Sequence, residues 1–359
     1  MGIALRERGE LELALEHYQK TIELNPHYVP AYNNLGNALR EQGHLEKAIH
    51  CYEQGLQFNA TSSELHNNLG NALQTQGHQE KAFEHYQLAL QFNPHYPEAH
   101  YNLGSLFHIQ GSTEQASEHY QHALRLQPNY SEAHHQLGVL FSQAGQLEKA
   151  HHHLSEALRL KPDFLEAQNN LGIVLQELGQ FDSAIECFHK VLERDPQQVE
   201  TYNNLGNTYK EQGKLKEAIE CYQQALRYQP NFLQAHHNLA VTRQENGQIE
   251  ETLKHYDYMV SFKAEPGIRV KQALLLPPIY QSVDDLNHWR KRFIENLTTL
   301  QEENIQLKDP FQEVGITHFY LTYQGLQDRI LQETVARFYR PFLPETIPLT
   351  QIKQNKLRI

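Results

Sequence analysis

Two consecutive stretches decide how this chain folds. Residues 29–62 read VPAYNNLGNALREQGHLEKAIHCYEQGLQFNATS, and residues 63–96 read SELHNNLGNALQTQGHQEKAFEHYQLALQFNPHY. Self-similarity at a fixed period predicts a stack of similar supersecondary units, each burying its apolar face against the next. The two stretches share a Leu-Gly pair that recurs every 34 residues, at Leu35-Gly36, Leu69-Gly70, Leu103-Gly104, Leu137-Gly138, Leu171-Gly172 and Leu205-Gly206.

The apolar positions within one period predict two helices. With Val29 counted as position 1, positions 4, 7, 8 and 11 share one face of a helix, and positions 17, 20, 24, 27 and 28 share one face of a second helix. A glycine at position 15, such as Gly43, is expected to end the first helix in a left-handed C-cap. A small residue at position 20 lets the two helices approach closely. A proline at position 32 prevents the second helix from continuing.

This is the pattern of the tetratricopeptide repeat (TPR). It predicts an all-α fold: a right-handed superhelical TPR solenoid of about eight repeats over residues 1–266, followed by a small helical capping or linker segment over 267–340. The first repeat is incomplete, because Met1 falls at position 7. The last repeat is atypical at positions 11, 20, 27 and 32, which carry Arg243, Thr252, Met259 and Ala264.

The composition excludes several classes of protein. The chain of 359 residues has 31 Lys and Arg against 43 Asp and Glu, and a formal net charge of −12 argues against a nucleic-acid binder. No apolar run approaches the roughly 20 residues of a membrane helix, and no signal peptide is expected from the first residues. The three cysteines do not form a disulfide framework, so a reducing, cytoplasmic compartment is expected.

The 23 histidines do not predict a metal site. Many of them occupy position 23, which supplies one side chain per repeat, whereas zinc needs about four converging ligands. No nucleophile–base, phosphate-loop or paired-carboxylate motif stands out, so no metal, cofactor or catalytic residue is expected. The cysteines fill position 23 in other repeats and are expected to pack there: Cys51, Cys187 and Cys221.

The surface that stacking leaves free is expected to carry the function. Positions 2, 5, 6, 9, 12 and 13 of each first helix share an arc that would line the concave groove of the solenoid. Asparagine recurs on this arc although it is a poor mid-helix residue, and its amide offers two donors and an acceptor. A ladder of such amides could hold the backbone of an extended peptide. The candidate groove residues are Asn34, Asn37, Asn68, Asn71, Asn102, Asn170, Asn204, Asn207 and Asn238.

This surface has two other interpretations. The asparagines at position 6 could tie the helices of adjacent repeats together, or could simply be inherited within a duplicated unit. Some TPR domains grip the C-terminal carboxylate of chaperones with lysines at positions 5 and 13. That clamp is excluded, because neither position carries lysine in this chain.

The 34-residue period stops at Gly267. Residues 268–276 predict a short helix that covers the last repeat, and Ser282 is a candidate N-cap for a helix over 283–301 that carries Trp289. Residues 310–325 are irregular and aromatic, and a helix is expected over 326–339. A proline-rich linker over 341–359 ends in KLRI, which is typical of the start of a β-strand.

This last part of the chain resembles a known family. The resemblance rests on LPPIYQS at 276–282, the Trp289-Arg290 pair, VG at 314–315 and FYLTYQG at 319–325, which are similar to bacterial SPINDLY-like relatives of O-GlcNAc transferase. In that family two catalytic lobes transfer a sugar from a nucleotide sugar to Ser or Thr of proteins. The resemblance implies that 341–359 is the linker and start of a missing catalytic domain, so the chain would be a fragment. No catalysis is expected from this chain alone.

The same resemblance narrows the expected function. It implies a protein–protein interaction module that binds extended segments of protein substrates, as the recognition arm of a SPINDLY-like glycosyltransferase, with neither nucleic acid nor membrane as a partner. A free-standing TPR scaffold with no enzyme is the alternative, and a homodimer through the array stays open. A small enzyme within 267–359, using His318, lacks a nucleophile–base arrangement. The residues that match the family's groove asparagines, from which Gln136 departs, are Asn34, Asn68, Asn102, Asn170, Asn204 and Asn238.

Overall fold

A computed structural model describes residues 1–263, 265–277, 279–314 and 329–342. These residues form helices joined by short turns and contain no β-strand, which confirms the predicted all-α class. Within the same residues, no helix is long and apolar enough to cross a membrane. The chain divides into two compact units, Met1–Gln180 and Phe181–Ile359.

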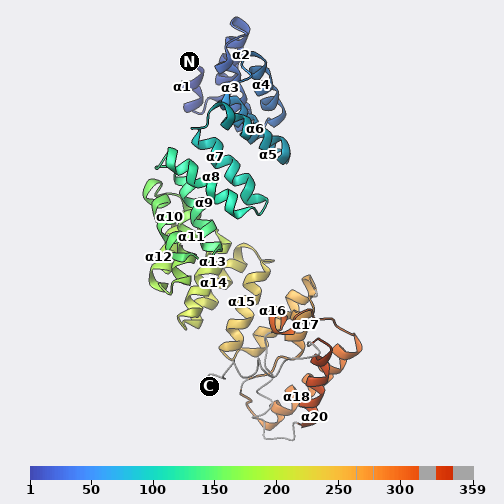
Figure 1. Ribbon diagram of the computed structural model, residues 1–359. Helices are drawn as coiled ribbons and strands as arrows, with labels where there is room; N and C mark the ends of the chain where they lie inside the picture. The colour runs from blue at the N-terminus through green and yellow to red at the C-terminus, as the bar shows by residue number, and fades with distance from the viewer. Residues whose placement is uncertain (264, 278, 315–328, 343–359) are drawn as a thin grey trace. The chain divides into compact units, whose positions relative to one another are not determined.

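The first unit is a stack of helix pairs (Figure 1). The two helices of one repeat contact each other, and the second helix of each repeat contacts the first helix of the next. Its helices are α1 (Gly2–Glu7), α2 (Leu11–Leu24), α3 (Val29–Glu41), α4 (Leu45–Phe58), α5 (Ser63–Thr75), α6 (Gln79–Phe92), α7 (Pro97–Ile109), α8 (Thr113–Leu126), α9 (Ser131–Gln143), α10 (Leu147–Leu160) and α11 (Leu165–Glu177).

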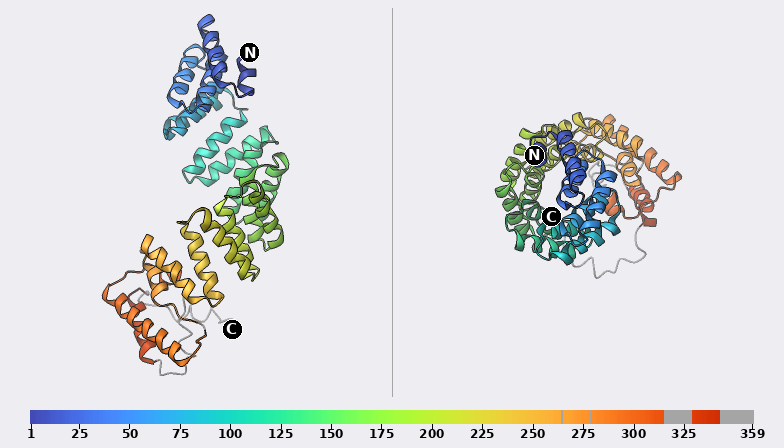
Figure 2. Two further views of the ribbon diagram at one scale, coloured as in Figure 1. Left: turned by 180° about the vertical axis from the view of Figure 1, so that it is seen from behind. Right: turned by 90° about the horizontal axis from the view of Figure 1, so that it is seen from above.

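The second unit holds further repeat helices and the segment that follows them. Figure 2 shows the helix pairs of each unit from two more directions. The repeat helices are α12 (Phe181–Arg194), α13 (Val199–Glu211), α14 (Leu215–Tyr228), α15 (Leu233–Glu245) and α16 (Ile249–Phe262). After them come α17 (Pro266–Ala273), α18 (Val283–Glu302), α19 (Pro310–Glu313), α20 (Arg329–Tyr339) and the 3-10 helix η2 (Arg340–Phe342).

A glycine in the left-handed region follows the first helix of each repeat. Gly43, Gly77 and Gly111 have φ angles of 81°, 86° and 77°, which other residues rarely adopt. The Gly43 N–H donates back to the carbonyl oxygen of Arg40 at 2.9 Å and so closes the end of α3. The glycine C-cap predicted at position 15 is confirmed.

A second glycine, at position 8, makes room for the ring at position 24. Tyr52 and Tyr86 are fully buried between the two helices of their repeats. A Cβ atom on Gly36 would lie 2.3 Å from Tyr52 Cε1, and one on Gly70 would lie 2.6 Å from Tyr86 Cε1. The close approach of the helices therefore depends on this glycine as well as on the small residue expected at position 20.

The segment after the repeats is fastened to α17 through backbone carbonyl groups. Arg292 of α18 donates hydrogen bonds to the carbonyl oxygens of Gln272 at 2.7 Å and Leu275 at 3.2 Å. Asn296, one turn further along α18, donates to the carbonyl oxygen of Ala273 at 3.0 Å. The last carbonyl groups of a helix have no partner within it, so these side chains cap α17 while they dock α18.

The last repeat and the segment after it share one hydrophobic core. Tyr256 and Met259 of α16 belong to the same buried cluster as Ile268 of α17 and Trp289 of α18. The Ser282 hydroxyl accepts a hydrogen bond from the Asp285 backbone N–H at 3.0 Å, as expected of the N-cap of α18. The predicted linker beyond residue 342, the KLRI strand and residue 318 lie outside the described residues.

Candidate peptide-binding surface

The nine candidate asparagines all lie on first helices of repeats, and each is half-buried. Several consecutive first helices contact one another within each unit, as α3 does with α5 and α13 with α15, which aligns their exposed faces. The structure therefore brings the candidates together in two groups. The first unit holds Asn34, Asn37, Asn68, Asn71, Asn102 and Asn170, and the second unit holds Asn204, Asn207 and Asn238.

Amides at position 6 donate hydrogen bonds to position 5 of the preceding repeat. One alternative interpretation of the sequence was that position 6 asparagines join adjacent repeats, and these hydrogen bonds are present. They join residues of first helices that are 35 residues apart in the chain. The bonds run from Nδ2 to the acceptor: Asn68 to Asn33 Oδ1 at 2.7 Å, Asn102 to Asn67 Oδ1 at 2.8 Å, Asn170 to His135 Nε2 at 2.9 Å, and Asn238 to Asn203 Oδ1 at 2.8 Å.

The amide acceptors at position 5 are held rigidly. Asn33, Asn67 and Asn203 expose only 6%, 3% and 1% of their surface. Asn33 also donates through Nδ2 to Glu64 Oε1 at 2.7 Å, which fixes the direction of its oxygen. Sequence analysis placed position 5 on the inner arc but assigned it no partner. The signal was the repeated Asn-Asn pair at positions 5 and 6.

These bonds leave part of each amide at position 6 unused. An asparagine side chain has two N–H donors and one oxygen acceptor. Asn68, Asn102 and Asn170 each donate one N–H, and their second N–H and their Oδ1 have no partner among the described residues. Asn238 differs, because its Nδ2 also donates to Asn207 Oδ1 at 3.0 Å. The first unit thus carries three amides that the protein orients and leaves open to a ligand.

Asparagines at position 9 serve the core of their own repeat. Asn37 Oδ1 accepts a hydrogen bond from the Tyr52 hydroxyl at 2.8 Å, and Asn207 Oδ1 accepts one from Tyr222 at 2.8 Å. Burial raises the pKa of Tyr52 to about 12, so its hydroxyl stays protonated and can donate. Position 9 is therefore a structural acceptor, and it offers less to a ligand than position 6 does.

The bond from Asn170 fixes the protonation of His135. An amide N–H donates to His135 Nε2, so this nitrogen carries no proton and Nδ1 carries the ring proton. Burial lowers the pKa of His135, which favours the neutral ring that this bond requires. The tie between α9 and α11 therefore depends on a neutral histidine.

Sequence analysis missed a set of histidine pairs. By sequence, the histidines at position 23 form a column of single side chains, but each of four lies against a histidine at position 4 of the same repeat. No three His, Cys, Asp or Glu side chains of the described residues are placed to hold a metal ion. The Nδ1–Nδ1 distances are 3.0 Å for His66–His85, 3.1 Å for His100–His119, 3.0 Å for His134–His153 and 2.8 Å for His236–His255.

Comparison with known sequences identifies the family. Tetratricopeptide-repeat profiles match residues 2–43, 36–77 and 75–111, then 96–163 and 163–231, and finally 221–254. Together these matches span residues 2–254, which is well over half of the chain, and the chain belongs to the tetratricopeptide-repeat family. It is a protein-interaction module of the TPR class. No curated protein matches the chain.

Solved structures show the same fold. Cut9, in the APC/C hetero-tetramer Cut9–Hcn1, is 18% identical with a TM-score of 0.55, and the match covers 81% of this chain and 54% of that one. PilF of Pseudomonas aeruginosa is 20% identical with a TM-score of 0.54, over 58% and 95% of the two chains. YrrB, described as a TPR protein with an unusual peptide-binding site, is 25% identical with a TM-score of 0.47, over 52% and 96%. At these identities, Cut9 and PilF establish the TPR solenoid fold and nothing more specific.

Proposed function

We propose that this protein binds extended peptide segments along the face formed by its first helices. The observation that carries the proposal is the set of open amides at Asn68, Asn102 and Asn170. Each is oriented by one hydrogen bond to the protein and keeps one donor and one acceptor for a ligand. A peptide backbone presents one N–H and one C=O per residue, which is the complement of such an amide.

The common repeat position of these amides favours an extended ligand over a folded one. Asn68, Asn102 and Asn170 occupy position 6 on α5, α7 and α11, and Gln136 occupies it on the intervening α9. An extended chain offers backbone groups at regular intervals of about 3.3 Å per residue, and these are the same for every sequence. The proposed site therefore tolerates many peptide sequences, and neighbouring side chains of the groove would supply what selectivity there is.

The sharpest test compares the loss of peptide affinity when the position 6 amides are removed with the loss when only the hydrogen bonds that orient them are removed. Asn68→Ala with Asn102→Ala removes two open amides together with two ties between repeats. Asn33→Ala with Asn67→Ala removes the same two ties but keeps both amides at position 6. The probe is a pool of fluorescently labelled, randomised peptides of about a dozen residues, and the readout is fluorescence anisotropy.

We expect the Asn68/Asn102 variant to bind the peptide pool about tenfold more weakly or worse, because each net hydrogen bond contributes about 1 kcal/mol. The Asn33/Asn67 variant should lose less affinity. Equal losses in both variants would mean that the amides at position 6 only support the array. Unchanged binding in a folded Asn68/Asn102 variant would overturn the proposal.

A narrower proposal rests on the sequence resemblance alone. The bound peptides would be Ser- or Thr-containing segments that a SPINDLY-like glycosyltransferase modifies, with this chain as its recognition arm. The support is LPPIYQS at 276–282 and the Trp289-Arg290 pair. The test is to purify the native polypeptide from its source cells with an antibody and to add a labelled nucleotide sugar and the bound peptides. Transfer of the label supports this proposal, and its absence from an intact, peptide-binding preparation favours a free-standing scaffold.

A further inference from the structure

Two columns of the repeat vary together in this chain. Position 23 is histidine in every repeat whose position 4 is histidine, and it is cysteine in every repeat whose position 4 is tyrosine or glutamine. The first repeat is not comparable, since its position 4 would precede Met1. The pairs are His66/His85, His100/His119, His134/His153 and His236/His255 on one side, and Tyr32/Cys51, Gln168/Cys187 and Tyr202/Cys221 on the other. Positions 19 residues apart that change together indicate a pair of side chains that works as one unit.

The geometry of the four histidine pairs is the same. The two Nδ1 atoms face each other at 2.8–3.1 Å. The other nitrogen of the histidine at position 4, Nε2, lies within hydrogen-bond distance of a backbone carbonyl oxygen at position 32 of the preceding repeat. These contacts are His66 to Ala60 at 3.0 Å, His100 to Pro94 at 3.2 Å, His134 to Pro128 at 3.2 Å, and His236 to Pro230 at 2.9 Å.

These contacts allow one arrangement of protons in the neutral pair. A carbonyl oxygen only accepts, so Nε2 at position 4 must carry a proton and donate it. The Nδ1 atom of that ring then has a lone pair, and the Nδ1 atom at position 23 must be the donor. Each pair is a hydrogen bond between the two helices of one repeat, and it links the chain before the first helix to the second helix.

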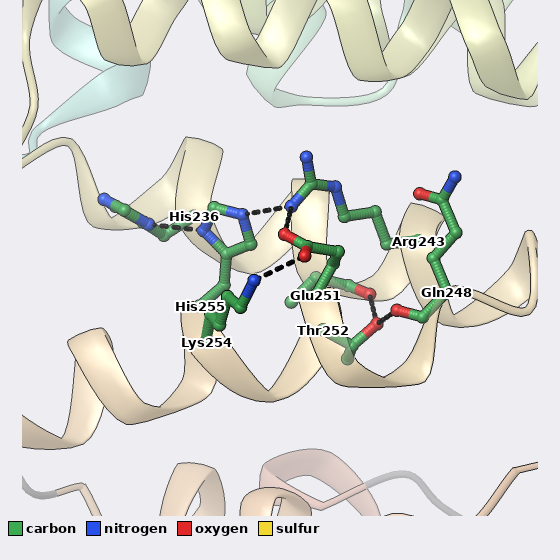
Figure 3. A network of polar contacts seen from close by, with 8 residues as sticks. His236, Arg243, Gln248, Glu251, Thr252, Lys254 and His255 are labelled. Carbon is green, nitrogen blue, oxygen red and sulfur yellow. Dashed lines mark hydrogen bonds and ion pairs between the residues drawn. The ribbon is translucent and has the colours of Figure 1, made fainter.

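Extra protons disturb this bond in stages. The first can be added to Nε2 at position 23, which leaves the bond intact. A second proton would place two N–H groups against each other about 3 Å apart, and the bond would break. In the last repeat even the first site is occupied, because His255 Nε2 accepts a hydrogen bond from Arg243 Nη1 at 2.9 Å (Figure 3). Arg243 is held there by Glu251 at 3.2 Å.

We propose that the four histidine pairs are proton-sensitive clamps, which hold the two helices of their repeats together when neutral and which stabilise the folded protein less as the solution becomes acidic. This property concerns the packing of the repeats and does not depend on peptide binding. It applies to three repeats of the first unit and to the last repeat of the second.

In the repeats without a histidine pair, positions 4 and 23 carry side chains that do not take up a proton. The Tyr32 hydroxyl donates to the carbonyl oxygen of Pro26 at 3.0 Å, which is the equivalent of the contact made by histidine at position 4. Burial raises the pKa of Cys51 to about 11 and that of Cys221 to about 12, so both thiols stay uncharged in acid and at neutral pH. Tyrosine with cysteine is therefore this chain's own proton-insensitive version of the pair.

The surroundings of the clamps favour the neutral state. Burial is the largest cause, and it lowers the pKa of the four histidines at position 23 to about 4. The partner histidine lowers it further in each pair. Other titratable groups also face the pairs: His95, Glu118, His122 and Arg125 at the second pair, His152, Glu156 and Arg159 at the third, and Arg243, Glu251 and Lys254 at the fourth.

The sign of the pH dependence follows from these values. In the unfolded chain a histidine titrates near pH 6.5 and is protonated below it. The four folded histidines at position 23 resist protonation until about pH 4. Unfolding therefore takes up about one proton at each of these histidines near pH 5. Stability is fully present above about pH 6.5 and is lost as the pH falls from there toward 4.

The first experiment reads the clamps directly in the unmodified protein. Nitrogen-15 NMR of its histidine rings distinguishes the two neutral tautomers and the charged form. We expect Nε2–H rings at position 4 and Nδ1–H rings at position 23 at pH 7.5. We also expect the position 23 rings to stay neutral at about pH 5.5, where the histidine of a short unstructured peptide added to the sample is protonated. Rings at position 23 that titrate together with this peptide would overturn the proposal.

The second experiment replaces each histidine pair by the chain's own alternative. The variant carries His66→Tyr, His100→Tyr, His134→Tyr and His236→Tyr together with His85→Cys, His119→Cys, His153→Cys and His255→Cys. Its urea midpoint should change much less between pH 7 and pH 5 than that of the unmodified protein. Tyr202→His with Cys221→His adds a fifth pair and should steepen the change. The same pH dependence in all three proteins would overturn the proposal, and the NMR measurement decides the matter if a variant does not fold.

Discussion

At the scale of single residues, asparagine has two separate uses on the first helices. At position 6 it joins neighbouring repeats, as Asn68 does with Asn33, and keeps free hydrogen-bonding groups. At position 9 it accepts a hydrogen bond from a tyrosine buried in its own repeat, as Asn37 does from Tyr52. Asparagine is unfavourable inside a helix because its side chain competes for backbone groups, and these partners offset that cost.

The use of position 9 predicts a stability effect. Asn37→Ala leaves the Tyr52 hydroxyl, which is buried, without its one partner among the described residues. An unsatisfied buried hydroxyl costs about 1–3 kcal/mol, so the free energy of unfolding should fall by that amount. The measurement is urea unfolding followed by circular dichroism.

Asn71→Ala is the matched control for this prediction. Tyr86 donates to Asn71 Oδ1 at 2.7 Å, but Gln74 Oε1 also lies 2.7 Å from the same hydroxyl. The hydroxyl therefore keeps an acceptor after the substitution, and the loss of stability should be smaller than for Asn37→Ala. Equal losses would contradict a structural role for the asparagine at position 9 as the acceptor of the buried hydroxyl.

At the scale of helices, the pair within most repeats is defined by a glycine that faces an aromatic ring, although Gly138 faces Leu154 and the last repeat carries Ala240. Position 8 on the first helix lies against position 24 on the second, and a methyl group there would meet the ring well below van der Waals distance. Glycine weakens a helix by about 1 kcal/mol relative to alanine, so its repeated use inside the first helix needs a packing reason. The fully buried tyrosine rings are that reason.

Gly70→Ala should therefore destabilise the protein by about 1–3 kcal/mol, because overpacking forces the Tyr86 ring or the helix to move. Gly55→Ala is the control. Its Cβ would meet the flexible end of Leu65 at 2.8 Å, and its repeat position carries alanine in Ala89 and Ala123. We expect Gly55→Ala to be close to neutral, since a gain in helix propensity offsets the contact. A thermal midpoint that falls as far for Gly55→Ala as for Gly70→Ala would refute the distinction.

At the scale of the whole molecule, the repeat array requires a cover at its last repeat. Each repeat buries its apolar face against the next, so a last repeat exposes that face unless another element packs on it. In this chain α17, α18 and α20 supply the cover and share a core with Tyr256 and Met259 of α16. Within this cover, Arg292 joins α18 to the carbonyl oxygens of Gln272, in α17, and of Leu275, just after it.

Deletion of residues 265–359 should therefore loosen the last repeats and leave distant ones unchanged. In a repeat protein, stability passes mainly between neighbours, so the loss fades along the array. Hydrogen exchange read by mass spectrometry should show faster exchange in α15 and α16 and unchanged exchange in α3 to α6. Exchange that accelerates uniformly over the chain would show instead that the array unfolds as one cooperative body.

The sequence determined the helices of the repeats, their ends and their pairing. After the repeats it was less exact: α17 spans Pro266–Ala273 and not 268–276, and α19 (Pro310–Glu313) lies in a stretch that was expected to be irregular. The 34-residue period and the position 15 glycine depend on contacts between residues that are close along the chain. The spacing of residue types predicts such contacts directly. The N-cap at Ser282 and the helix after it were predictable for the same reason. The same spacing placed the candidate asparagines on one helix face.

Only the tertiary structure decided which atoms these side chains meet. Asn68 meets Asn33 across a boundary between repeats, and His66 meets His85 across a helix pair, at distances set by how the helices pack. A repeat pattern shows that residues share a face, but not whether an amide is occupied or open. The pairing of histidines at positions 4 and 23 was present in the sequence as two matching columns. Only the structure showed that the two Nδ1 atoms lie within hydrogen-bond distance. Whether two rings form a hydrogen bond depends on differences of tenths of an ångström in their separation, which a sequence does not reveal.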